Sequence, residues 1–219
     1  MIDDDFRKLI EAGDVDGLRA ALGREPARAN QTIRWYLNRG NESDPLHFVC
    51  DCVGNGWLAN GREGEIAAML IEHGAAIDGS AGRGSPLIAA ASLGAERVAA
   101  VLIEAGADAE RTGLFGARAL HWAAWAGEAG IVAQLLARKV DIEPRCSEFG
   151  ATPLFWAVHG YGPHGPATKK AQVEAARLLI ETGAAVETAN KLGQTARLLA
   201  RTGARPEMLL LLESSASIA

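Results

Sequence analysis

Cysteine, aromatic residues and long apolar runs are all scarce in this chain. Its 219 residues include three cysteines, and 5% of its residues are aromatic. A small, odd number of cysteines argues against a disulfide framework. No apolar run approaches the roughly 18 residues of a membrane-spanning helix, so we expect no membrane association. The first residues, Met1-Ile2-Asp3-Asp4-Asp5, are acidic and unlike a signal peptide, so we expect a cytoplasmic protein.

The chain also lacks a strongly basic region and the short motifs of common enzyme classes. The formal net charge is −5 and no basic cluster stands out, so we expect no nucleic-acid partner. The sequence contains no Gly-x-Ser-x-Gly, no Gly-rich phosphate loop and no His-Glu-x-x-His. We therefore expect a protein that is not an enzyme and that uses no cofactor and no metal.

What the chain has in abundance is repetition. A Pro-Leu step or its equivalent recurs at Asp44-Pro45-Leu46-His47, Ser85-Pro86-Leu87-Ile88, Arg118-Ala119-Leu120-His121 and Thr152-Pro153-Leu154-Phe155. Small apolar residues follow, and each copy closes with Leu70-Ile71-Glu72-His73-Gly74-Ala75, Leu102-Ile103-Glu104-Ala105-Gly106-Ala107, Leu135-Leu136-Ala137-Arg138-Lys139-Val140 or Leu179-Ile180-Glu181-Thr182-Gly183-Ala184. A period near 33 residues predicts a stack of small units rather than one globular core with a buried active site.

Each copy carries the signals of two helices. Ser85 and Thr152 can cap a helix start, and the proline that follows suits the first helical turn. The second half of each copy has an apolar stripe at helical spacing. Glycine closes most copies, where a left-handed residue ends a helix. Lys139 stands at that place in one copy, and we expect it to cost about 1 kcal/mol there.

Two copies contain about nine or ten extra residues between their halves. These insertions lie near residues 53–61 and 160–166, and both are dense in glycine, proline and aromatic residues, which predicts loops. They occupy the same place in the second and fifth units. The hypothesis is that Trp57, Tyr161 and His164 in these loops grip a partner. The alternative is tolerated drift, since longer surface loops cost little free energy.

This pattern resembles the ankyrin repeat, which carries a Thr-Pro-Leu-His-x-Ala signature. The resemblance covers roughly residues 6–212 and implies an all-α, ankyrin-like solenoid of helix-turn-helix repeats with β-turn connections. We expect a single domain over residues 1–219 and a monomer. Its six units are expected at about 1–40, 41–79, 80–111, 112–144, 145–189 and 190–213.

The resemblance also implies a role in binding another protein through a concave face. That face is made by turn tips and by first-helix residues. The expected exposed row of first-helix residues is Asp51, Ser92, Trp125 and His159, with Leu93 beside it and Phe115 and Phe149 at turn tips. Trp125 is the sharpest candidate because exposed aromatic residues are good interface anchors. The sequence does not name the partner.

Several residues have competing interpretations. Trp122 and Trp156 are expected in the core, and His47 and His121 are expected to make structural hydrogen bonds. His159 and His164 have no further ligand at suitable spacing, which argues against a metal site. The alternative function is small-molecule binding or catalysis in an aromatic pocket of Trp125, Trp156, Tyr161 and His159. A deep pocket there, rather than an open groove, would favour that alternative.

Overall fold

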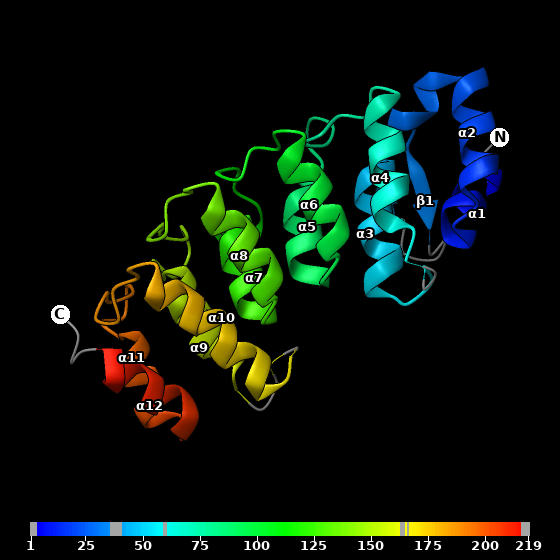
Figure 1. Cartoon of the computed structure of the whole chain (residues 1–219). Helices are drawn as coiled ribbons and strands as arrows, with labels where there is room; N and C mark the ends of the chain where they lie inside the picture. Colours follow the sequence, from blue (N-terminus) through cyan, green and yellow to red (C-terminus); the bar gives the residue numbers. More distant parts are fainter. Residues whose placement is uncertain (1–3, 36–40, 59–60, 163–164, 166, 216–219) are drawn as a thin grey trace. The chain divides into compact units, whose positions relative to one another are not determined.

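The computed structural model describes residues 4–35, 41–58, 61–162, 165 and 167–215, and it divides the chain into two compact units (Figure 1). Unit 1 is residues 1–108 and unit 2 is residues 109–219. Each unit is described by itself. The expectation of a single domain over residues 1–219 stays a prediction.

Unit 1 contains six helices, a short 3₁₀ helix and one small hairpin within its described residues. The elements are α1 (Asp4–Ala12), α2 (Val15–Arg24), η1 (Pro26–Asn30), β1 (Ile33–Trp35), β2 (Asn41–Ser43), α3 (Pro45–Gly54), α4 (Glu63–Glu72), α5 (Pro86–Leu93) and α6 (Glu96–Glu104). Strands β1 and β2 pair antiparallel, with Ile33 opposite Ser43. The repeat pattern gave no sign of this hairpin.

Unit 2 is built from three pairs of helices. Its elements are η2 (Leu114–Gly116), α7 (Ala119–Ala126), α8 (Ala129–Ala137), α9 (Pro153–Gly160), α10 (Lys169–Glu181), α11 (Ala196–Thr202) and α12 (Pro206–Ser215). Across both units most described residues are helical, which confirms the prediction of an all-α chain.

Helices begin and end where the sequence signals them. Pro45, Pro86 and Pro153 each occupy the first helical position of α3, α5 and α9. A proline there loses no hydrogen bond, because the first amide groups of a helix have no partner within it. The hydroxyl of Thr152 also accepts a hydrogen bond from the amide of Phe155 at 3.3 Å. Gly94 ends α5 with a left-handed φ of 70°, which glycine adopts without a steric penalty.

Corresponding helices of successive pairs pack on one another. In unit 1, α3 contacts α5 and α4 contacts α6. In unit 2, α7 contacts α9 and α9 contacts α11, while α8 contacts α10 and α10 contacts α12. Small residues such as Ala90, Ala124 and Ala157 are fully buried between the first helices. Their size lets these helices approach closely, so the larger side chains gather at the edges of the contact.

The described part of each insertion contains a turn, and another part of its length continues a helix. Residues 55–57 turn between α3 and α4, and residues 161 and 162 turn after α9. Helix α10 has 13 residues where α8 has nine, so the second insertion also lengthens a helix. The two insertions belong to different units.

Lys139 adopts the left-handed conformation that its place in the repeat predicts. Its φ is 57°, where Gly74, Gly106 and Gly183 have φ values of 88°, 88° and 107°. We expect Lys139→Gly to raise the free energy of unfolding by about 0.5–1 kcal/mol, because relief of the left-handed strain exceeds the added entropy of the unfolded chain. Urea unfolding measures this change.

The matched control is Ala133→Gly, at an exposed position inside α8. It should lower the free energy of unfolding by about 1 kcal/mol. A Lys139→Gly protein no more stable than the wild type would contradict the strain at this position.

Candidate functional site

An aromatic pocket in unit 2 is the strongest candidate site. Its volume is about 600 Å³. The lining residues, called the aromatic pocket below, are Phe115, Trp122, Trp125, Phe149, Ala151, Phe155, Trp156, His159, Asn190, Leu192, Gln194 and Leu199. Within this set, aromatic and aliphatic side chains predominate and no side chain carries a permanent charge.

Three successive helix pairs and the segments between them supply these residues. Trp122 and Trp125 lie three residues apart on α7, and Trp156 and His159 lie three residues apart on α9. Residues at that spacing share one face of a helix, so the two helices present matching faces to the pocket. Phe149 precedes α9, Leu192 precedes α11, and both therefore come from connecting segments.

The aromatic rings of the pocket contact one another edge to face, tilted or, for Phe115 and Trp122, stacked. Trp122 lies 5.2 Å from Trp156 and 5.7 Å from Trp125, measured between ring centroids, with interplanar angles of 73° and 88°. The Phe115 ring lies 5.6 Å from Phe149 and 6.1 Å from Trp122. Such arrangements are favourable because the positive edge of one ring meets the negative face of another.

Phe115 reaches this cluster through an unusual backbone conformation. Its φ is 62°, in the left-handed region, which is rare for a bulky residue. The conformation costs about 1–2 kcal/mol, which the surrounding ring contacts must offset. The floor of the pocket is part of the core, since Ala151, Phe155 and Trp156 are buried.

Apolar side chains remain exposed around the pocket. We call the apolar rim Leu114, Phe149, Leu192 and Leu198, whose exposed fractions run from 44% to 79%. Phe149 and Leu192 line the pocket, and Leu114 and Leu198 are the sequence neighbours of the lining residues Phe115 and Leu199. Scattered exposed leucines are ordinary, but apolar residues gathered at one place mark binding surfaces.

His159 is the one titratable group of the pocket lining. Partial burial of the imidazole lowers its pKa, and the positive charge of Arg205 lowers that pKa further. Both effects disfavour the protonated ring. His159 is therefore neutral at pH 7 and can donate or accept a hydrogen bond at the edge of the pocket.

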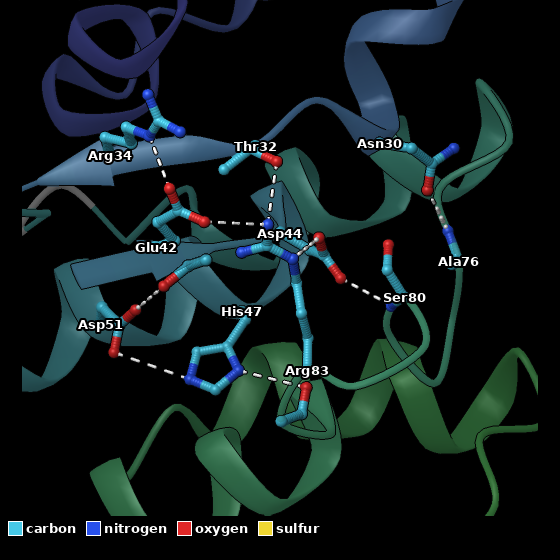
Figure 2. Close-up of polar contacts among 12 residues, drawn as sticks. Asn30, Thr32, Arg34, Glu42, Asp44, His47, Asp51, Ala76, Ser80 and Arg83 are labelled. Carbon is cyan, nitrogen blue, oxygen red and sulfur yellow. Dashed lines mark hydrogen bonds and ion pairs between the residues drawn. The ribbon is translucent and has the colours of Figure 1, made fainter. Parts of the chain in front are cut away.

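A second, polar pocket of about 450 Å³ lies in unit 1, between the β hairpin and residues 81–84. Figure 2 shows the hydrogen bonds and ion pairs that its charged side chains make. Arg83 lies 3.3 Å from Glu42 and 3.3 Å from Asp44, and the other carboxylate oxygen of Asp44 accepts from the Ser80 amide at 2.6 Å. These pairs fasten the 80–84 segment to the hairpin, so we interpret this pocket as structural.

Asp51 is buried, contrary to the expectation that it belongs to an exposed row. It is 8% exposed, and Ser43 of the unexpected hairpin donates its hydroxyl to Asp51 at 2.9 Å (Figure 2). The Nε2 atom of His47 lies 3.9 Å from Asp51, and its Nδ1 atom lies 3.3 Å from the carbonyl oxygen of Gly84. Burial raises the pKa of Asp51, although His47 and Ser43 act to lower it.

Cys52 does not supply a nucleophile beside Asp51. Burial raises the pKa of its thiol far above the usual value, with smaller contributions from the negative charges of Glu11 and Asp51. The thiolate is the reactive form of cysteine, and burial of this kind suppresses it. The arrangement of Ser43, His47, Asp51 and Cys52 therefore lacks an activated nucleophile.

Trp57 and Tyr161, the described aromatic residues of the two insertions, pack against neighbouring side chains of their own units. Trp57 is half-buried in unit 1, with its ring 5.6 Å from Trp35 and 6.4 Å from Phe48. Tyr161 is 4% exposed and donates its hydroxyl to Glu207 of α12. Burial of the hydroxyl and, to a smaller extent, its interaction with Glu207 raise the pKa of Tyr161 to about 12. His164 lies outside the described residues.

The remaining predicted residues divide between the two units. Ser92 and Leu93 are half-buried at the end of α5, and the hydroxyl of Ser92 donates to the carbonyl of Ala89 at 3.1 Å. Phe115, Trp125, Phe149 and His159 all line the aromatic pocket. The repeat pattern singled out these four as binding residues, and Trp156 and Tyr161 as further members of an alternative aromatic pocket; Trp156 lines the pocket and Tyr161 does not. The pattern missed Leu192, although Leu192 follows the second insertion at the place that Phe149 occupies one copy earlier.

No cluster of three or more metal-binding side chains occurs among the residues the structure describes. None of the described helices is both long enough and apolar enough to cross a membrane. No known protein-family model matches the chain, and no curated protein shows significant similarity to it.

The buried carboxyl of Asp51 predicts a specific pH dependence of stability. A raised pKa in the folded state means that the folded protein loses stability as pH rises through that pKa. Asp51→Asn removes this loss, and the new amide oxygen can still accept from Ser43. We therefore expect the free energy of unfolding of the variant, relative to that of the wild type, to increase from pH 4 to pH 7. Urea unfolding at the two pH values measures this change.

Asp16→Asn is the matched control, because the side chain of Asp16 is 91% exposed. Its stability relative to the wild type should change little over the same range. An Asp51→Asn difference that is equal at pH 4 and pH 7 would show that Asp51 is not held in an unfavourable buried environment.

Proposed function

We propose that this chain is an ankyrin-like repeat protein that binds another protein through the apolar rim and the mouth of the aromatic pocket. The proposed setting is the cytoplasm, with the chain acting as a monomer and without catalysis. The single observation that carries the proposal is the gathering of exposed apolar side chains around the pocket.

The helix pairs support the ankyrin-like assignment. The starts of α3, α5, α7 and α9 coincide with the four opening steps of the repeated sequence. Left-handed residues follow the second helices at Gly74, Gly106, Lys139 and Gly183. Corresponding helices of neighbouring pairs contact one another within each unit, as a stack of repeats requires.

The apolar rim is evidence that the partner is a macromolecule. Leu114, Phe149 and Leu192 come from three successive connecting segments, so the exposed apolar surface extends beyond the opening of the pocket. A protein surface can cover such an extended row and remove it from water. Trp125 and Phe149 supply the aromatic contacts that concentrate binding energy at interfaces.

Leu192→Ser tests this proposal. Leu192 is 79% exposed, so its replacement leaves the core intact. We expect the variant to bind its captured partner at least about tenfold more weakly, because it loses a buried contact at the centre of the interface. Affinity capture from the source cell's lysate, followed by calorimetry on the captured protein, measures this loss.

Leu210→Ser is the matched control, because Leu210 is 70% exposed on α12 and does not line the pocket. It should bind the partner as the wild type does. Equal affinities of wild type and Leu192→Ser would exclude the rim as the interface.

His159 gives the proposed interaction a pH dependence. A partner over the pocket withdraws the imidazole from water and lowers its pKa beyond the effect of Arg205. The proton must then leave on binding, so affinity falls as pH drops through the pKa of free His159, by at most about tenfold per pH unit. Calorimetry at pH 7 and pH 5 should show this fall for the wild type and a smaller one for His159→Gln. An equal fall in both proteins would assign the proton to another group.

A further inference from the structure

The aromatic pocket is deeper than a protein–protein contact at the rim requires. Its floor is formed by Phe155 and Trp156, which belong to the buried core of unit 2. Its volume of about 600 Å³ lies within the range of about 300–1,000 Å³ that is typical of small-molecule sites. A partner lying across Leu114, Phe149 and Leu192 would cover the opening without filling this space.

The chemistry of the lining defines what would fill the pocket. The side chains of Arg205 and Glu207 are not part of the lining, and no permanently charged side chain is. A charge buried against the lining would therefore lose its hydration without a counter-ion among these residues, and Arg205 acts from outside the lining, near His159. The Trp122 ring meets those of Trp125 and Trp156 edge to face, and Phe115 stacks on Trp122. A flat aromatic molecule extends these arrangements better than a puckered aliphatic one does.

Two polar groups of the lining are available to such a molecule. The ring nitrogens of His159 and the Nε2 group of Gln194 form no hydrogen bond with other residues in the described part of the chain. In addition, the indole N–H of Trp122 is buried without a partner there. Buried polar groups normally have partners, so the unpaired indole N–H of Trp122 beside the cavity points to a ligand that pairs with it. The exposed His159 and half-buried Gln194 side chains can bond to water or to such a ligand.

We propose that the aromatic pocket binds a flat, uncharged aromatic small molecule with one hydrogen-bonding substituent, of the phenol or indole class. The ring system packs among Trp122, Trp125 and Trp156, and the substituent pairs with His159 or Gln194. This site lies behind the proposed protein interface at the rim and the mouth of the pocket, and Trp125, Phe149, His159 and Leu192 contribute to both.

The experiment titrates the whole chain with three matched probes, followed by amide NMR shifts and calorimetry. 2-Naphthol is flat, uncharged and carries a hydroxyl. 2-Naphthoate has a charged carboxylate in place of the hydroxyl. 2-Decalol keeps the two-ring skeleton and the hydroxyl but is saturated and not flat. We expect 2-naphthol to bind at least about tenfold more tightly than either of the others.

Three variants test whether 2-naphthol binds in the aromatic pocket. Trp125→Ala should weaken 2-naphthol binding at least about tenfold, since a stacking face is lost. Phe149→Ala, at the exposed mouth, gives a second test in case Trp125→Ala folds poorly. Trp57→Ala is the matched control, because Trp57 is also half-buried but lies in unit 1. It should leave the affinity unchanged.

Three outcomes would overturn the proposal. One is the absence of 2-naphthol binding at millimolar concentration. Another is equal or tighter binding of 2-naphthoate or 2-decalol, and the third is an affinity insensitive to Trp125→Ala and Phe149→Ala. None of these affects the protein-binding proposal, which the Leu192→Ser experiment tests separately.

Discussion

The hydrogen bonds of a single buried histidine hold together the segments on which the candidate site depends. The Nδ1 atom of His121 accepts from the amide of Arg118 at 3.2 Å, and its Nε2 atom lies 3.1 Å from the carbonyl oxygen of Ala151. An accepting Nδ1 fixes the neutral tautomer that carries its proton on Nε2. Burial lowers the pKa of His121 to about 4, so this tautomer persists at neutral pH.

This bridge joins α7 to the segment that leads into α9. The segment carries Phe149 at the mouth of the pocket and Ala151 in its lining, while α7 carries Trp122 and Trp125. The edge of the His121 ring also meets Trp156 at 5.5 Å between centroids. Because fully buried alanines keep α7 and α9 close, the indoles are displaced to the edge of the contact, where they form the walls of the pocket.

Local signals were sufficient to predict much of the fold. Proline at the first helical position and left-handed residues after the second helices depend only on neighbouring residues, so Pro86, Pro153 and Lys139 adopt the expected conformations. The periodicity also predicted that Phe115, Trp125, Phe149 and His159 share one face. Asp51 and Tyr161 were misjudged because their burial depends on Ser43 and Glu207, which no repeat pattern connects to them. Leu192 was missed although the repeat register places it where Phe149 stands one copy earlier.

The measurement that tests the account most directly is an amide NMR map of the labelled chain on addition of its captured partner. The account predicts that the largest changes fall on unit 2, at residues 114–125, 149–159 and 190–199, which carry the rim and the pocket. Changes confined to unit 1, around Trp57 or the 80–84 segment, would contradict it.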